Sequence, residues 1–463
     1  GEMALLTGTE LSPTTPTELE SALERDRVEF LFAMFVDLHG KPCAKLVPVD
    51  ALDQLLSDGA GFAGFAAGPM GQKPSSPDML AMPDISSYMP APWRPGLGIL
   101  QCDPYCDGEP WAYAPRVILG RALQLLANAG MSMRAGAEAE YFLIRHGDNG
   151  AIEIADSRDR AALPCYDARA LTRMYDHLTS VARLQTELGW SNYASDHEDA
   201  NGQFEQNFRY AEPMITADRI IVFRYMVHTL ASDAGMAATF MPKPFGHLTG
   251  NGLHMHTSLW DPDGTVELFC DPDDKRGLGL SQLAYQYIGG LLTHAPALTA
   301  ITCPTVNSYK RLAAPAPNSG AAWSPAFATY GGNDRTQMLR VPEPGRVENR
   351  LIDGSANPYL ALAGQIAAGL DGIQRGLDPG DPCSTDLLRT SPERASELGL
   401  LPLPSTLVEA LDFLEDDAVL RAALGKTSGG DYLDYFVEVK RTEFRSYHSA
   451  ISPWELDTYL NLF

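Results

Sequence analysis

The sequence predicts an α+β protein with a small amino-terminal domain, residues 1–112, and a large second domain, residues 113–463. Two observations predict this architecture. A chain of 463 residues is long enough for two or three domains. Strand-like and helix-like segments also follow one another without an internal repeat. With 45% hydrophobic and 20% charged residues, the composition is typical of a soluble globular protein.

The net charge and the cysteines exclude several classes of function. A net charge of −24 argues against a nucleic-acid partner, because the phosphate backbone attracts basic proteins. The sequence has no signal peptide and no apolar run of about 18 residues, so we expect no membrane association. The seven cysteines are odd in number and form no CxxC pair. We therefore expect reduced thiols in a cytoplasmic protein.

The first domain is expected to combine a few strands with short helices. Two apolar runs are separated by Leu38-His39-Gly40-Lys41, which is typical of a hairpin. In chain order we expect a helix at 16–27, strands at 28–38 and 42–48, a helix at 49–57, a Gly/Ala/Pro-rich loop at 58–77, an extended segment at 83–95 and a strand at 97–103.

The second domain is expected to begin with a helix from Pro115 to Asn128, because proline is well placed in a first helical turn. The hydrophobic pattern then predicts further strands and helices. Strands are expected near 132–145, 202–210, 236–242, 252–260, 335–341 and 346–352. Helices are expected near 167–188, 214–234, 278–296, 357–375 and 405–422.

One short segment, Arg346-Val347-Glu348-Asn349-Arg350, is the first candidate for chemistry. Alternate side chains of a strand point to the same face, so Arg346, Glu348 and Arg350 share one face. Two guanidinium groups beside one carboxylate, if placed in a cleft, form a site for anions with room for a metal ion. The rest of the chain should then supply further carboxylates, imidazoles and a clamp for phosphate.

Further carboxylates occur in two places. Glu138 and Glu140 share one face of a predicted strand, where adjacent like charges are unfavourable unless cations lie between them. Glu198 and Glu205 are separated by a glycine-containing turn. Taken singly, the first pair is more typical of solvated surface carboxylates, and the second is equally compatible with an ordinary acidic loop.

Imidazoles and arginines complete the set. His254, His256 and Ser258 share one strand face after a glycine-rich start; neutral imidazole suits Mn²⁺ or donates to phosphate, although an isolated histidine is usually structural. Arginine forks suit carboxylates and phosphates. The last third of the chain contains five candidates: Arg311, Arg335, Arg340, Arg346 and Arg350. Carboxylates, imidazoles and arginines together favour metal-assisted phosphoryl transfer, although no Walker A or GxGxxG motif occurs.

In these segments the chain resembles the glutamine synthetase family over nearly its whole length. The matching signatures occur in the family's order. They are Asp58-Gly59, E-x-E at 138–140, H-E…G-Q-x-E at 197–205, M-P-K-P at 241–244, G-x-H-x-H-x-S-L-W at 252–260, N-S-Y-K-R at 307–311, N-D-R-T at 333–336, R-x-E-x-R at 346–350 and A-N-P-Y-L at 356–360.

The resemblance implies a β-grasp-like amino-terminal domain, a catalytic domain on a curved antiparallel sheet, and a dodecamer of two stacked hexameric rings. It also implies ATP as co-substrate, Mg²⁺ or Mn²⁺ at two or more positions, and active sites between subunits. The match also implies the role of each residue. The first cation would be held by Glu140, Glu198 and Glu205, and the second by Glu138, His254 and Glu348. Glutamate would be bound by Gly250, Arg311 and Arg350, and ATP by His256, Ser258, Arg340 and Arg346; Arg335 would neutralise the transferred phosphoryl group, and Asp58 of a neighbouring subunit, with Glu198, would receive the amine.

The implied reaction phosphorylates the γ-carboxylate of glutamate and then displaces phosphate with an amine. Three departures from the family's usual sequence pattern bear on which amine the protein uses. Residues 311–320 lack the acidic flap residue that is usual in ammonia-using members. Ala60 and Gly61 replace two hydroxyl residues beside Phe62 and Phe65. Thr249 replaces an asparagine for which Asn251 is expected to compensate.

These departures resemble the type III branch, which includes γ-glutamylmethylamide synthetases. Fewer hydroxyl groups and more apolar contact favour methylamine, although one methyl group contributes only about 1 kcal/mol. Two alternatives remain. The same chemistry with ammonia or a larger amine is one, and a non-enzymatic ring protein, which the retained ligand residues disfavour, is the other.

Overall fold

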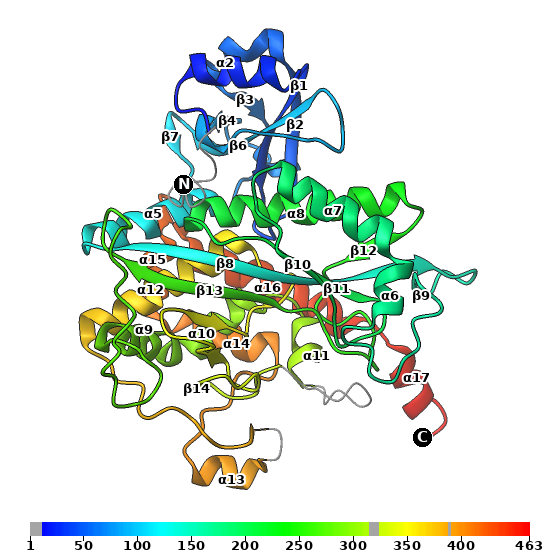
Figure 1. Ribbon diagram of the computed structural model, residues 1–463, viewed down its shortest axis with the longest axis vertical. Helices are drawn as coiled ribbons and strands as arrows, with labels where there is room; N and C mark the ends of the chain where they lie inside the picture. Colours follow the sequence, from blue (N-terminus) through cyan, green and yellow to red (C-terminus); the bar gives the residue numbers. More distant parts are fainter. Residues whose placement is uncertain (1–11, 314–323, 388–389) are drawn as a thin grey trace.

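The computed structural model describes residues 12–313, 324–387 and 390–463. Figure 1 shows a small amino-terminal unit above a larger body, in which many of the helices lie behind one long curved sheet. The predicted α+β class is confirmed, because each unit combines a largely antiparallel sheet with helices.

The small unit is built on a sheet with strand order β2-β1-β6-β4-β3, to which β5 and β7 add at β6. Its strands are β1 (Phe30–Val36), β2 (Pro42–Pro48), β3 (Ala60–Phe62), β4 (Met79–Pro83), β5 (Met89–Pro90), β6 (Leu97–Cys106) and β7 (Glu109–Pro110). Its helices are α2 (Pro16–Arg25), η1 (Val49–Ala51), α3 (Leu52–Asp58), α4 (Gly64–Ala67) and η2 (Ile85–Ser87). Leu19, Leu52 and Leu100 pack in one core between helices and sheet.

Segment 58–77 is not the continuous loop that its composition predicts. Ala60–Phe62 forms β3, which pairs antiparallel with β4, and α4 follows. The ring of Phe62 stacks on Phe35, with the ring centroids 4.1 Å apart. Met70 is also buried in the core of the small unit, and its carbonyl oxygen accepts from Trp111 Nε1 at 2.7 Å. These few contacts hold the segment, and the small residues around them mask its hydrophobic pattern.

The large sheet has strand order β10-β11-β8-β13-β16-β15-β14, with β9 and β12 paired to β8. Its strands are β8 (Ser132–His146), β9 (Ile152–Ile154), β10 (Ala194–His197), β11 (Gln203–Asn207), β12 (Ala237–Thr239), β13 (Leu253–Trp260), β14 (Tyr330–Gly331), β15 (Leu339–Arg340) and β16 (Val347–Asn349). Ala137, Ala139 and Tyr141 on β8 belong to the main core, whereas Glu138 and Glu140 line a cleft. Strand alternation thus gives this sheet an apolar face and an acidic face.

Helices supply most of the core of the large unit. They are α5 (Pro115–Asn128), α6 (Ala168–Arg173), α7 (Tyr175–Glu187), α8 (Pro213–Asp233), α9 (Gln282–Thr293), α10 (Ala295–Thr302), α11 (Ser308–Ala313), α12 (Pro358–Arg375), α13 (Pro392–Glu397), α14 (Leu407–Glu415), α15 (Ala418–Leu424), α16 (Tyr432–Ser449) and α17 (Pro453–Tyr459), with a hairpin of β17 (Lys426–Thr427) and β18 (Gly430–Asp431). Among the described residues, no helix is long and apolar enough to span a membrane.

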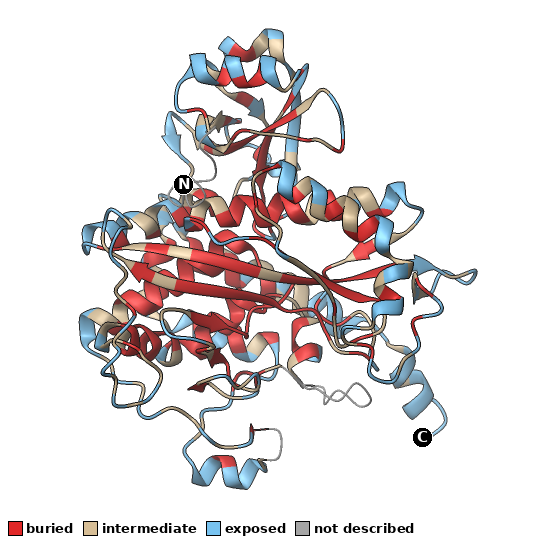
Figure 2. Ribbon diagram, viewed as in Figure 1, coloured by how far each residue is buried: buried red, intermediate tan, exposed pale blue. Residues whose placement is uncertain are grey.

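Helix α12 lies at the centre of this layer. Its side chains from Pro358 to Leu370 are buried, as Figure 2 shows in red. The side chain of Asn357 caps its first turn by accepting from the backbone N–H of Tyr359 at 3.1 Å, and Gly376 ends it with a left-handed φ of 62°. Because α12 follows β16 within a few residues, its burial fixes one end of the strand that carries Glu348.

Several expected elements are shorter than predicted. The expected strands at 335–341 and 346–352 are reduced to two and three residues. The expected helix at 405–422 breaks at Asp417, whose side chain caps α15 by accepting from the backbone N–H of Leu420. Strands β9 and β10 and helices α10 and α16 were not predicted. The two strands and α10 have 3, 4 and 8 residues, too few to show a clear period. Helix α16 has 18 residues and does carry a helical period, with Leu433, Phe436 and Lys440 buried.

A buried ionic network joins the small unit to the large one. The guanidinium group of Arg116 on α5 contacts Asp218 of α8 at 3.0 Å, Asp84 at 2.8 Å and Asp103 at 3.1 Å. Arg116 and Asp218 are almost fully buried. Removal of one member of such a network leaves uncompensated charge in the interior.

We predict that Arg116→Ala lowers the free energy of unfolding by about 3–5 kcal/mol, because it leaves Asp218 buried without its cation. The measurement is thermal or urea unfolding of the full chain. Arg94→Ala is a matched control, because Arg94 also joins the two units through Asp233 but both side chains are about half exposed. A melting temperature for Arg116→Ala as high as that for Arg94→Ala would contradict the prediction.

Candidate active site

Two triplets of ligand-type side chains lie on the acidic face of the large sheet. The first contains Glu140 on β8, Glu198 after β10 and Glu205 on β11; the second contains Glu138 on β8, His256 on β13 and Glu348 on β16. Within each triplet, one ligand atom from every residue lies within 4.8 Å of the others. Divalent cations such as Mg²⁺ and Mn²⁺ favour carboxylate-rich sets of this kind.

Strand register explains how residues far apart in the chain meet. Glu205 pairs with Glu140 where β11 runs antiparallel to β8. His256 pairs with Glu348 where β13 runs antiparallel to β16. Directly paired residues on one face have Cβ atoms about 5 Å apart, so ligand atoms of both pairs converge.

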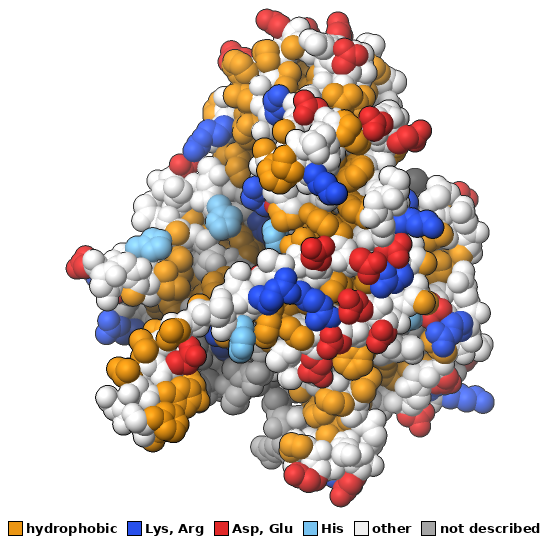
Figure 3. Space-filling view, turned by 180° about the vertical axis from the view of Figure 1, so that it is seen from behind, with side chains coloured by type: hydrophobic (Ala, Val, Ile, Leu, Met, Phe, Trp, Pro, Cys, Tyr) orange, Lys and Arg blue, Asp and Glu red, His pale blue; other side chains and the backbone are white. Residues whose placement is uncertain are grey.

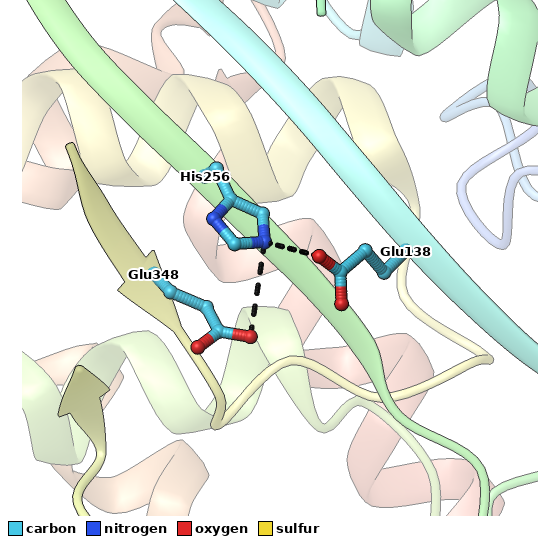
Figure 4. A group of neighbouring side chains, drawn as sticks. All are labelled: Glu138, His256 and Glu348. Carbon is cyan, nitrogen blue, oxygen red and sulfur yellow. Dashed lines mark hydrogen bonds and ion pairs between the residues drawn. The ribbon is translucent and has the colours of Figure 1, made fainter. Parts of the chain in front are cut away.

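The histidines differ from the set that the resemblance implies, in which His254 joins Glu138 and Glu348. Instead, His256 Nε2 lies 2.7 Å from Glu138 Oε1 and 3.7 Å from Glu348 Oε1 (Figure 4). His254 lies between the triplets, with Nδ1 3.5 Å from Glu348 Oε1 and Nε2 3.8 Å from Glu140 Oε1. Side chains on a sheet also reach diagonal neighbours, so strand register alone does not choose between the two imidazoles.

Burial and mutual repulsion make the first triplet bind protons strongly. Burial raises the pKa of Glu140 to about 8, and the charge of Glu205 adds to this shift. Burial also raises the pKa values of Glu198 and Glu205 well above their usual range; the charge of Glu140 raises that of Glu198 further, and the charge of Glu198 raises that of Glu205 further. A divalent cation relieves both effects, because it neutralises the charge that burial disfavours.

The second triplet has a more balanced environment. Burial alone would raise the pKa of Glu138, but the hydrogen bond and charge of His256, together with Arg350, lower it. Burial lowers the pKa of His254 well below its usual range, and the charges of Arg350 and Arg311 lower it further. His254 is therefore neutral and has a lone pair for a cation.

All five predicted arginines line the same cleft: Arg311, Arg335, Arg340, Arg346 and Arg350. The carboxylate of Glu348 is held between two of them, with Arg340 Nη1 at 2.8 Å and Arg350 Nη1 at 3.0 Å. Arg311 donates to the backbone carbonyls of Leu351 at 2.9 Å and Arg350 at 3.0 Å. A guanidinium group has five N–H donors, so Arg311 has donors beyond these two bonds.

The cleft has a volume of about 530 Å³ and adjoins a second cavity of about 640 Å³. Glu138, His256 and Arg346 line both cavities. The second cavity has aromatic walls, including Tyr210 and Trp260. One polar end and one aromatic end, each within the size range of small-molecule sites, suit a ligand with a charged group and a flat ring.

The glycine-rich loop places Gly250 in the cleft, as predicted, but it does not place Asn251 there. Gly250 lines the cleft, and a Cβ atom there would collide with the backbone carbonyl of Pro242 and crowd Arg311. Asn251, which was expected to compensate for Thr249, is fully buried and accepts a hydrogen bond from Gln203 Nε2 at 2.8 Å. Asn251 therefore braces the loop from behind, and Thr249 is the residue that lines the cleft.

Other predicted residues lie elsewhere. Ser258 lines the aromatic cavity and accepts from Trp260 Nε1 at 2.9 Å. Asp58 is exposed at the end of α3 in the small unit and does not line the cleft of its own chain. Of the segment 311–320, where the usual flap acid is lacking, residues 314–320 lie outside the described residues.

Sequence reasoning missed six described residues of the cleft wall: Cys165, Tyr166, Asp196, Asp199, Asn207 and Ser324. Tyr166 adopts a left-handed backbone conformation with φ of 64°, which is unusual for a residue other than glycine. No motif marks this segment. Two signals were available: Asp199 is next to Glu198, and Asn207 shares a strand face with Glu205 on β11.

Comparisons with known proteins find relatives over nearly the whole chain. The family model described as glutamine synthetase, catalytic domain, matches residues 112–459. A glutamine synthetase of Rhizobium leguminosarum bv. phaseoli is 43% identical, covering 96% of this chain and 99% of the relative. A glutamate–methylamine ligase of Methyloversatilis universalis is 42% identical, covering 97% and 100%. The solved structure titled "GmaS/ADP complex-Conformation 1" has a TM-score of 0.89 and 45% identity, covering 96% of this chain and 99% of that one.

We predict that Glu348→Gln weakens Mn²⁺ binding at least about tenfold, because it removes a ligand charge while preserving shape. Isothermal titration calorimetry measures this affinity. Glutamine is preferable to alanine, because alanine also leaves two arginines beside an empty space. Glu153→Gln serves as the control, since Glu153 is a half-exposed glutamate on β9 paired with Arg145. Wild-type affinity in Glu348→Gln would contradict a ligand role.

Proposed function

The chain belongs to the glutamine synthetase family, and on that premise we propose that it is an ATP-dependent ligase that joins methylamine to the γ-carboxylate of L-glutamate. The products are γ-glutamylmethylamide, ADP and phosphate. The observation that carries the proposal is the cleft in which two ligand triplets face five arginines beside an aromatic cavity. Phosphoryl transfer between two anions requires cationic groups and metal ions of this kind to stabilise the negative charge.

The ligand triplets fit two divalent cations, Mg²⁺ or Mn²⁺. Glu140, Glu198 and Glu205 would hold one, and Glu138 and Glu348 with His254 or His256 would hold the other. Bound cations would neutralise the triphosphate of ATP and the charge of the transferred group. The raised pKa values of the first triplet support this assignment, because such buried carboxylates are poorly stable without a cation.

The remaining groups have roles that follow from their positions. Arg311 and Arg350 are buried at one end of the cleft and suit the carboxylate of glutamate. Arg340 and Arg346 suit the phosphates of ATP, with His256 and Ser258 nearby. Arg335 lines the cleft with them and suits the transferred phosphoryl group.

The reaction has two steps. A γ-carboxylate oxygen of glutamate attacks the γ-phosphorus of ATP, and ADP leaves from γ-glutamyl phosphate. The nitrogen of the neutral amine then attacks the γ-carbon, and phosphate leaves. Glu198 lines the cleft, so it is placed to accept the proton that the amine loses.

Methylamine rather than ammonia is supported by two observations. Two solved structures titled as GmaS match over 96% of the chain, with TM-scores of 0.89 and 0.87. Cys165 and Tyr166 beside Glu198 also offer apolar surface for a methyl group. Phe62 and Phe65 were expected to provide apolar contact for the amine. Phe62 packs inside the small unit, whereas Phe65 is 58% exposed. Ammonia remains the second candidate, because the relative at 43% identity is named glutamine synthetase.

We extend the proposal to a homo-oligomer, expected to be a dodecamer of two hexameric rings, in the cytoplasm. Asp58 is absent from the cleft of its own chain, so an amine-binding role requires a neighbouring subunit. Helix α17 extends from the body, and Trp454, Leu460 and Phe463 on this terminal segment expose apolar surface (Figures 1 and 3). Exposed apolar patches of this kind favour a protein partner. The cysteines, all seven of which the structure describes as free thiols, support a reducing compartment.

The proposal is tested by phosphate release from ATP with Mg²⁺, glutamate and a panel of amines. We predict a kcat/KM for methylamine several-fold above that for ammonia, since burial of one methyl group stabilises by about 1 kcal/mol. Omission of glutamate is the control for uncoupled hydrolysis. A higher kcat/KM for ammonia than for methylamine would identify ammonia as the preferred amine. If no amine led to phosphate release, the proposed ligase activity would be contradicted.

A further inference from the structure

A buried histidine–carboxylate pair lies directly behind the first triplet and belongs to neither ligand set. His197 is the last residue of β10 and precedes Glu198 in the chain. The side chains of His197 and Asp159 are both fully buried, with His197 Nε2 2.6 Å from Asp159 Oδ2. Two ionisable groups are rarely buried together unless their geometry is fixed.

The pair holds both ends of the turn that carries Glu198. His197 Nδ1 lies 2.7 Å from the carbonyl oxygen of Glu198. Asp159 accepts from the backbone N–H of Gly202 at 2.8 Å and from Asn201 Nδ2 at 3.0 Å. One carboxylate therefore binds the residue before the turn and two residues at its end, so the turn moves only if buried hydrogen bonds break.

The same residues also hold the neighbouring segment that carries Tyr166. The backbone N–H of Tyr166 donates to the carbonyl oxygen of His197 at 3.1 Å. Asn201 Nδ2 also donates to the carbonyl oxygen of Ala161 at 3.1 Å. Tyr166 and Glu198 both line the cleft, so these bonds hold two of its lining residues in place together.

Glu198 requires such support because its neighbours repel it. Its carboxylate lies in one triplet with Glu140 and Glu205, and Asp199 is the next residue. A carboxylate in a flexible turn would move toward solvent and away from the other two. A turn that is held by buried hydrogen bonds keeps the ligand atom in place before a cation arrives.

We propose that Asp159 and His197 are positioning residues that hold the carboxylate of Glu198 in the first cation site. The proposal rests on the proposed function, because it takes the first triplet to bind a divalent cation. Neither residue lines the cleft. Partners that orient ligands in this way typically contribute about ten- to hundredfold to metal affinity.

The test compares His197→Gln and Asp159→Asn with wild type in the full chain. Isothermal titration calorimetry with Mn²⁺ gives the affinity, and thermal unfolding without metal gives the stability. We expect an affinity about ten- to hundredfold weaker in each variant. The double variant should be no weaker than the weaker single one, because the two residues act as one unit. If His197→Gln fails to fold, Asp159→Asn carries the test.

His294→Gln is the matched control. His294 is also a buried histidine between two carboxylates, with Nδ1 2.5 Å from Asp417 Oδ2 and Nε2 2.7 Å from Asp371 Oδ2, but it lies among the helices and does not line the cleft. The His294→Gln substitution should lower the melting temperature and leave the Mn²⁺ affinity unchanged. Mn²⁺ affinity at the wild-type level in both His197→Gln and Asp159→Asn would overturn the positioning role. Failure of wild type to bind Mn²⁺ would instead overturn the proposed function.

Discussion

Repulsion between buried carboxylates is the constraint on which the rest of the site depends. Three glutamates of the first triplet meet in a space where burial alone already disfavours their charge. Such a cluster persists only if neighbouring cations compensate it and if the backbone prevents its members from separating. The five arginines of the cleft meet the first requirement in part, and the divalent cations of the proposed reaction complete it. The buried pair of Asp159 and His197 meets the second.

The fold meets these requirements by separating the two faces of one sheet. On β8, alanines and Tyr141 join the helical core, whereas Glu138 and Glu140 face the cleft. The helical layer, with α12 at its centre, makes the apolar face rigid. Strands from distant parts of the chain then add ligands in register, so convergence of the ligands follows from strand pairing. The ionic network of Arg116 ties the small unit, which carries Asp58, to this frame.

Much of this arrangement follows from the sequence. The alternation in Glu138-Ala139-Glu140 and His254-Met255-His256 predicts which side chains share a face, and the structure brings all five glutamates to one cleft. The sequence does not decide which imidazole approaches Glu138, because that depends on diagonal reach across strands. Nor does it reveal that Asn251 turns inward or that Tyr166 lines the wall, since both depend on local backbone geometry. Short strands such as β15 lack enough residues to show a period.

The central claim is that two divalent cations bind at the two ligand triplets. Anomalous diffraction from crystals of the full chain grown with Mn²⁺ and a non-hydrolysable ATP analogue measures it most directly. The account predicts two anomalous peaks per chain, one among Glu140, Glu198 and Glu205 and the other beside Glu138 and Glu348. Its result would also show which histidine ligates the second ion. A cleft with the nucleotide bound but without Mn²⁺ peaks at these glutamates would contradict the account.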